Sequence, residues 1–75
     1  MNKQRRSRLR AAKNKLVEVR DEIDAIREEE DESRDNMPES LQGTDRFEES
    51  ETISDAMDSA VSSIDEAIEF IEETI

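Results

Sequence analysis

Apolar side chains recur at heptad spacing in both halves of this 75-residue chain. In the first half, steps of three and four residues alternate through Leu9, Ala12, Leu16, Val19, Ile23 and Ile26. The second half continues in steps of three or four through Ile53, Met57, Val61, Ile64, Ile68, Ile71 and Ile75. This spacing lines up apolar side chains along one side of an α-helix, and that stripe needs a partner to bury it. We therefore predict two amphipathic helices, over about residues 3–35 and 45–74.

Composition alone gives a competing interpretation. Charged residues make up 44% of the chain and its net charge is −11, which is typical of disordered chains. A disordered chain has no reason to keep a heptad register in both halves, so we favour the helices.

The connector between the two helices, residues 36–44, holds the only Pro and the only Gly. Pro38 disfavours helical geometry at the residue before it, so the first helix should end near Asp35. Pro38 can also open a short helical turn, which Gly43 would terminate. Helices joined by a short connection usually pack antiparallel. We predict an all-α, coiled-coil-like antiparallel hairpin that forms a single domain over residues 1–75.

The predicted register pairs residues whose numbers add up to about 80. It places Leu9 near Ile71, Leu16 near Ile64, Ile23 near Met57 and Ile26 near Ile53. Charge supports this orientation, because residues 1–17 carry seven Lys or Arg and no acid, whereas residues 36–75 carry twelve acids and only Arg46. An antiparallel hairpin lays the basic start beside the acidic end, near Asp65, Glu66, Glu69, Glu72 and Glu73.

A single hairpin of this size supplies little core, so we expect self-association into a helical bundle. Phe70 lies off the main stripe of the second helix and is available for a second contact surface. If Phe70 instead folds over the edge of the hairpin, the chain stays monomeric.

The chain lacks the residue types on which several kinds of catalytic and binding site depend. The chain has no Cys and no His, and one Gly cannot build a phosphate-binding loop. We expect no catalytic residues, no cofactor and no metal site. No apolar run is long enough to cross a bilayer, and no apolar stretch follows the basic N-terminus as in a signal peptide. We expect a cytoplasmic protein without a membrane partner.

The charged segments leave two binding alternatives open. The basic arm can neutralise phosphates, although no aromatic residue is interleaved with it and the acidic remainder of the chain repels polyanions. It comprises Lys3, Arg5, Arg6, Arg8 and Arg10. We expect it to pair with acids of the same chain or of another copy, and nucleic-acid binding is the weaker alternative. The acidic face of the second helix can in turn imitate a nucleic-acid backbone.

The connector carries a more individual pattern. It reads Asp-Asn-x-Pro-Glu-x-Leu-Gln from Asp35 to Gln42, and an Arg-x-Glu-Glu start to the second helix follows at Arg46. Together with the basic first helix and the acidic second one, this resembles small helical-hairpin proteins of phage and mobile-element genomes. The resemblance implies origin and fold and no activity.

These observations predict a non-enzymatic helical interaction protein. It is expected to act in the cytoplasm, that of the host if a phage encodes it, by binding a host, defence or phage protein. The alternatives are an acidic mimic that blocks a nucleic-acid-binding protein, and nucleic-acid binding through the basic arm.

Overall fold

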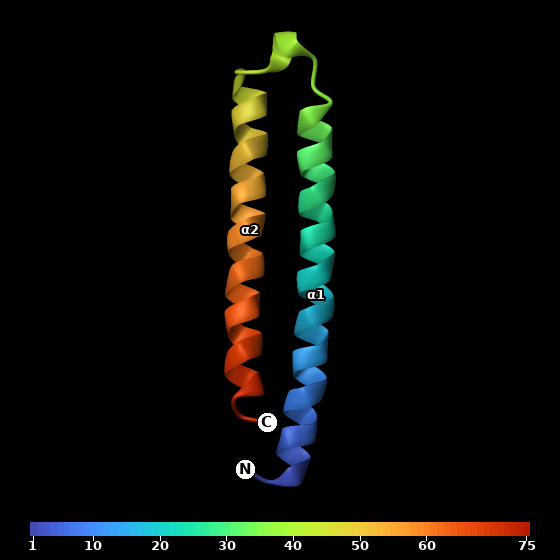
Figure 1. Ribbon diagram of the computed structural model, residues 1–75, viewed down its shortest axis with the longest axis vertical. Coiled ribbons are helices and arrows are strands. Elements are labelled where there is room, and N and C mark those ends of the chain that lie inside the picture. The colour runs from blue at the N-terminus through green and yellow to red at the C-terminus, as the bar shows by residue number, and fades with distance from the viewer.

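The chain folds into two long helices that run side by side in opposite directions (Figure 1). The computed structural model describes residues 1–75. Helix α1 spans Lys3–Asp35, a short 3₁₀ helix η1 spans Glu39–Leu41, and helix α2 spans Asp45–Glu72. The architecture is the predicted all-α hairpin. Helix α1 has the bounds expected from the sequence, and α2 stops two residues before the expected end.

Local signals in the sequence set the helix ends. The side chain of Asn2 caps α1 by accepting a hydrogen bond from the backbone N–H of Arg5 at 2.8 Å. Pro38 immediately precedes η1, as the sequence predicts. The turn then closes at Gly43, whose φ of 81° lies in the left-handed region that favours glycine. The chain therefore reverses direction within the nine residues that separate Asp35 from Asp45.

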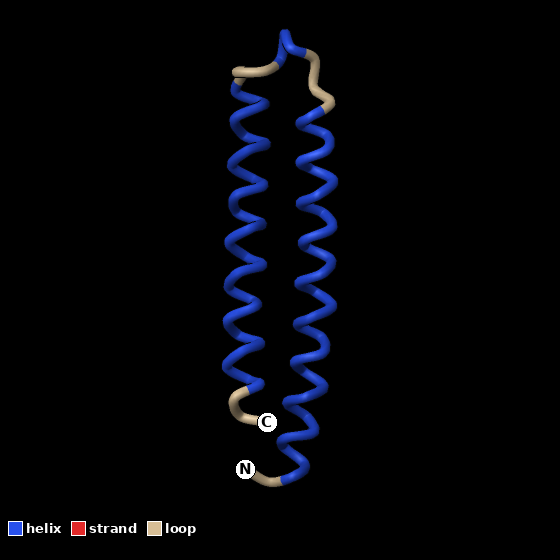
Figure 2. The backbone as a smooth tube through the Cα atoms, viewed as in Figure 1, coloured by secondary structure: helices blue, strands red, loops and turns tan.

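The hairpin is a thin rod, with Cα extents of 60 × 14 × 12 Å. Both termini lie at one end and the connector lies at the other (Figure 2). The first turns of α1 extend past the end of α2 (Figure 1). A rod of two helices buries little, and only three residues are buried, namely Ile68, Ser50 and Ser54.

The apolar seam between the helices follows part of the predicted stripe. Ile68 is 6% exposed, and the other members are half-buried: Leu9, Leu16, Ile23, Met57, Val61, Ile64 and Ile71. The prediction was wrong for Ala12, which is exposed, and for Val19, Ile26 and Ile53, which are 43–46% exposed. These four lie beside the seam because polar residues take the seam positions that they were expected to fill. Phe70, expected off the seam, is 68% exposed.

Candidate interaction surfaces

Among the rows of α1 residues that face α2, one is mostly apolar and one is basic. The first row holds Leu9, Leu16, Ile23 and Glu30, spaced by seven residues, and all four are half-buried. The second row, also spaced by seven, holds Lys13, Arg20, Arg27 and Arg34, again half-buried. Long basic side chains fit such a seam because their aliphatic stems cover apolar surface while the charged ends reach water.

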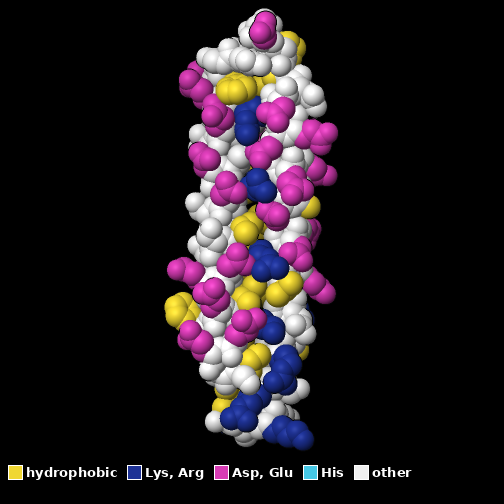
Figure 3. All heavy atoms as spheres, in the orientation of Figure 1, with side chains coloured by type: hydrophobic (Ala, Val, Ile, Leu, Met, Phe, Trp, Pro, Cys, Tyr) yellow, Lys and Arg dark blue, Asp and Glu magenta, His cyan; other side chains and the backbone are white.

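The basic row meets acids of α2 in a regular ion-pair ladder. Lys13 Nζ lies 3.8 Å from Glu72 Oε1, and Arg20 Nη1 lies 2.8 Å from Asp65 Oδ1. Arg27 Nε lies 3.1 Å from Asp58 Oδ1. The two residue numbers of each pair add up to 85, so the ladder fixes one register along the rod. In Figure 3 basic side chains run down the middle of this face, with acids on both sides.

Acids of α1 itself hold the ladder arginines from the other side. The guanidinium of Arg27 donates to Asp24 at 3.0 Å and to Asp31 at 2.9 Å. Arg20 donates to its neighbour Asp21 at 3.1 Å. The hydrogen bond to Asp65 raises the pKa of Arg20, and the bond to Asp24 raises that of Arg27, so both stay charged. Each exposed pair stabilises the fold by little, and the set mainly specifies orientation and register.

Near the connector, the seam becomes a polar network, which we call the tip network. It consists of Glu30, Asp31, Arg34, Ser50 and Ser54. Ser50 Oγ donates to Glu30 Oε1 at 2.9 Å, and Ser54 Oγ donates to Asp31 Oδ1 at 2.7 Å. Arg34 donates to Ser54 Oγ at 2.8 Å and to Asp31 Oδ1 at 2.9 Å. No buried side-chain polar atom in the chain lacks a hydrogen-bond partner.

The tip network has two consequences. The numbers of Ser50 and Glu30 add up to 80, as predicted for facing positions of the apolar stripes. The ladder sum of 85 is the same register, because the ladder rows lie four residues further along α1 and one residue further along α2. The hydroxyl of Ser54, and after it the guanidinium of Arg34, lower the pKa of Asp31 from its ordinary value. The carboxylate is therefore the preferred form of Asp31 in the folded chain.

On the other side of the seam lies an uncharged surface, which we call the apolar face. Heptad geometry places the residues just before the basic row on this side, and the equivalent row of α2 lies beside them. The face consists of Ala12, Val19 and Ile26 from α1 and Ile53, Ala60 and Ala67 from α2. Ala12 is exposed, Val19, Ile26 and Ile53 are 43–46% exposed, and Ala60 and Ala67 are half-buried, so the face is a partly exposed apolar strip along the middle of the rod.

The basic arm lies at the free end of α1 and is not neutralised within the chain. None of Lys3, Arg5, Arg6, Arg8 and Arg10 makes an ion pair, so the pairing expected with the acidic end of α2 is absent within one chain. The first turns of α1 extend past α2 (Figure 1), and Arg8 and Arg10 are exposed. Of the acids expected to meet this end, only Glu72 and Asp65 pair, with Lys13 and Arg20.

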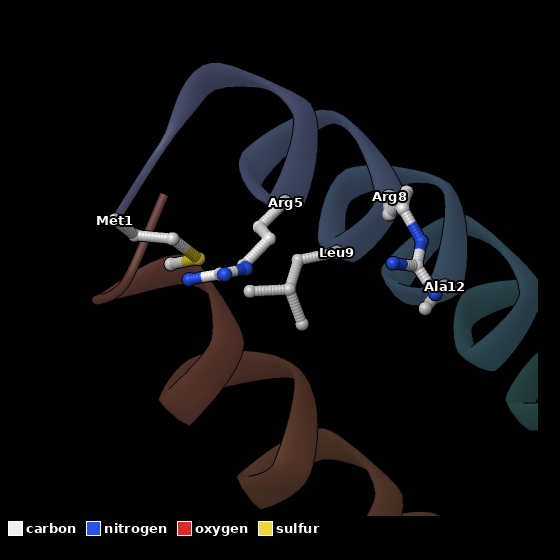
Figure 4. A pocket seen from close by; sticks show the side chains of 5 residues that line it. All are labelled: Met1, Arg5, Arg8, Leu9 and Ala12. Carbon is white, nitrogen blue, oxygen red and sulfur yellow. The ribbon is translucent and has the colours of Figure 1, made fainter.

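A recess of about 420 Å³ lies in this end of the rod, on the side of the apolar face. Met1, Leu9 and Ala12 supply apolar walls, and Arg5 and Arg8 supply cations. Figure 4 shows the side chains of Met1, Arg5 and Leu9 pointing toward the end of α2. An occupant that matches this recess is apolar with an acidic group beside it.

The ladder and the tip network were not anticipated from the sequence. Both consist of polar residues at seam positions, whereas the predicted seam took only apolar ones. The signal was present, because Lys13, Arg20, Arg27 and Arg34 repeat at the interval that Asp58, Asp65 and Glu72 repeat in the second half. Matching periods of opposite charge indicate neighbouring rows of an antiparallel pair.

Fold and surfaces together define an all-α helical hairpin with one charged side and one apolar side. Comparisons with protein-family models, with curated proteins and with solved structures found no match. No group of three or more acidic side chains is placed to hold a metal ion. Neither helix has a stretch both long and apolar enough to cross a membrane.

Proposed function

We propose that this chain is a non-enzymatic interaction protein, which uses its apolar face to bind a protein partner. The observation that carries the proposal is the exposure of Val19, Ile26 and Ile53 along one side of the rod. On the other side, ion pairs join α1 to α2. Exposed apolar strips with polar surroundings are characteristic of protein-binding surfaces.

The ladder supports this function by fixing the shape of the surface. Rungs at three levels hold α1 and α2 in one register, and the tip network holds the connector end. A rod that is ordered before binding loses less conformational entropy when a partner docks. The apolar face is thus a preformed strip, with the side chains of both helices already aligned.

The resemblance of the connector to phage and mobile-element proteins supports a proposal about the organism from which the partner comes. If the chain is phage-encoded, the partner we propose is a host or defence protein in the host cytoplasm. An apolar groove or helix face of that protein would cover Val19 and Ile26.

Affinity capture from a host lysate at two salt concentrations tests the proposal. The variant Val19→Ser/Ile26→Ser should lose a partner that wild type retains at both salt concentrations, because apolar contacts are not screened. The matched control, Ala11→Ser/Ala25→Ser, changes exposed positions on the outer side of α1 and should keep the partner. Equal capture by both variants would contradict the assignment of the apolar face.

One observation favours a second candidate, an acidic mimic of nucleic acid. Only six of the 22 acidic side chains take part in ion pairs, so 16 remain uncompensated along the rod. Such a rod attracts a protein with a basic groove. A mimic would capture a basic protein at low salt, lose it at high salt, and be insensitive to Val19→Ser/Ile26→Ser.

A further inference from the structure

The rod exposes more surface than its mass requires. Its accessible surface is 5720 Å² for 8.7 kDa, whereas a folded monomer of this mass typically exposes about 4,700 Å². The apolar face contributes to this excess with Val19, Ile26 and Ile53. One side of a rod of 60 by 14 Å also has about the area, ~800 Å² per partner, that a stable interface buries.

The charged row that borders the apolar face on α1 changes sign at its middle. It consists of Arg8, Lys15, Glu22 and Glu29, spaced by seven residues and exposed. The apolar row beside it, Ala12, Val19 and Ile26, is centred at the same level, on Val19. If the α1 helix of a second copy lies antiparallel to the first and crosses it at Val19, the apolar rows of the two helices therefore face each other. The same arrangement brings Arg8 opposite the partner's Glu29 and Lys15 opposite the partner's Glu22.

We propose that a second copy of this chain covers the apolar face, with the two α1 helices antiparallel and crossing at Val19. This assignment rests on the proposed function because it uses the same surface. The second copy covers the apolar face in the free protein, and a host partner binds there only by displacing that copy. The result is a four-helix bundle in which the two connectors lie at opposite ends. The symmetric arrangement is closed, because each copy offers the same patch to the other.

The recess at the free end of α1 fits this occupant. Ala12 and the partner's Ile26 are equally far from the crossing point, so the partner's Ile26 comes to the apolar wall formed by Leu9 and Ala12. The partner's Glu29 then lies at the level of Arg8. The partner's α1 thus supplies, within one helical turn, both the apolar side chain and the acid that match the recess.

In a second arrangement, both connectors lie at the same end, and fewer of the charged side chains beside the apolar face meet an opposite charge. This arrangement sets α1 against the partner's α2, so Val19 faces the partner's Ala60. The row of α2 that borders the apolar face is Glu49, Ala56, Ser63 and Phe70. Its only charge is Glu49, which would come opposite Glu29, and the level of Arg8 is occupied by Phe70. Like charges then meet, and the basic arm gains no acid from this row.

Light scattering over a concentration series measures the mass of the particle, and we expect two copies. Because the chain has no Cys, single cysteines then report the arrangement without background. Val19→Cys should form an intermolecular disulfide under mild oxidation, and Ala25→Cys, on the outer side of α1, should not. A dimer in which Val19→Cys does not cross-link, while Val19→Cys/Ala60→Cys does, would establish the same-end arrangement and overturn the proposal.

Charge reversal tests the flanking contacts independently of cross-linking. Arg8→Glu/Lys15→Glu replaces attractive contacts by repulsive ones and should raise the dimer dissociation constant about tenfold or more. Adding Glu22→Lys/Glu29→Arg reverses the whole row, so unlike charges meet again and the affinity should return. Circular dichroism checks that each variant keeps its helicity.

Different experimental results would contradict the dimer proposed here and the function proposed above. A chain that is helical yet monomeric at every concentration would overturn the dimer and leave the binding of another protein intact. A dimer whose apolar-face variants capture the same lysate proteins as wild type would keep the second copy and remove the host partner.

Discussion

The two halves of the seam between α1 and α2 are built from different chemistry. Toward the termini, the seam is apolar, with Leu9, Leu16, Ile64 and Ile68. Toward the connector, it is the tip network, in which Ser50 and Ser54 are each 5% exposed and fully hydrogen-bonded. Apolar burial is non-directional, so the apolar side chains of the terminal half stabilise the rod without strongly selecting one register. In this half the register is selected by the ion pairs Lys13–Glu72 and Arg20–Asp65. The tip network selects a register, because its hydrogen bonds form only between particular partners.

The largest expected effect lies in the apolar half. Ile68→Ala removes the most buried apolar side chain and should lower the free energy of unfolding by about 2–4 kcal/mol. The matched control is Ile53→Ala, the same substitution at a position that is 43% exposed, and we expect less than half the loss. Urea unfolding at concentrations where the midpoint no longer depends on protein concentration measures both. Equal losses would show that the terminal half is not the main source of stability.

A smaller effect is expected in the tip network. Ser54→Ala removes the hydroxyl that donates to Asp31 and accepts from Arg34, and should cost about 1–2 kcal/mol. The control is Ser59→Ala, on an exposed position of α2, where Ala is the better helix former and stability should not fall. If both substitutions behave alike, the hydrogen bonds of the tip contribute nothing measurable.

The smallest effect is dependent on pH. Because the folded chain lowers the pKa of Asp31, the ionised carboxylate stabilises the fold at neutral pH. Asp31→Asn should therefore lower the Tm at pH 7, and the difference from wild type should shrink as the pH falls below about 4, where the unfolded carboxyl takes up a proton. Thermal melts from pH 7 to pH 2.5 follow this difference. In a Ser54→Ala background the pH dependence should be weaker, and an unchanged dependence would place its cause elsewhere.

The sequence predicted the topology because its signals were local and repeated. The heptad spacing gave two helices, and Pro38 with Gly43 gave the place of the reversal. What it left ambiguous was the rotation of α1 about its axis. Leu9, Leu16 and Ile23 can share the seam with the apolar row of Val19 or with the basic row of Arg20, and hydrophobicity favours the first. The second prevails because α2 presents acids at matching intervals.

The tip network could not be predicted from the sequence for a related reason. Ser50 and Ser54 are ordinary surface residues by type, and Glu30 breaks the apolar pattern of its row. Their burial depends on several hydrogen bonds forming together across two helices. A search for apolar periodicity assigns such positions to the solvent.

The seven-residue repeat of the ladder sets the step in which the length of the rod can change. Deleting one heptad from the middle of α1 and one from the same level of α2 shortens the rod by about 10 Å. Every remaining cation of the ladder then still faces its carboxylate. Deletions of one to six residues rotate the outer segments about the helix axis and separate the rows. Hairpins of several lengths, all with the same connector, can therefore be derived from this one chain by paired deletions.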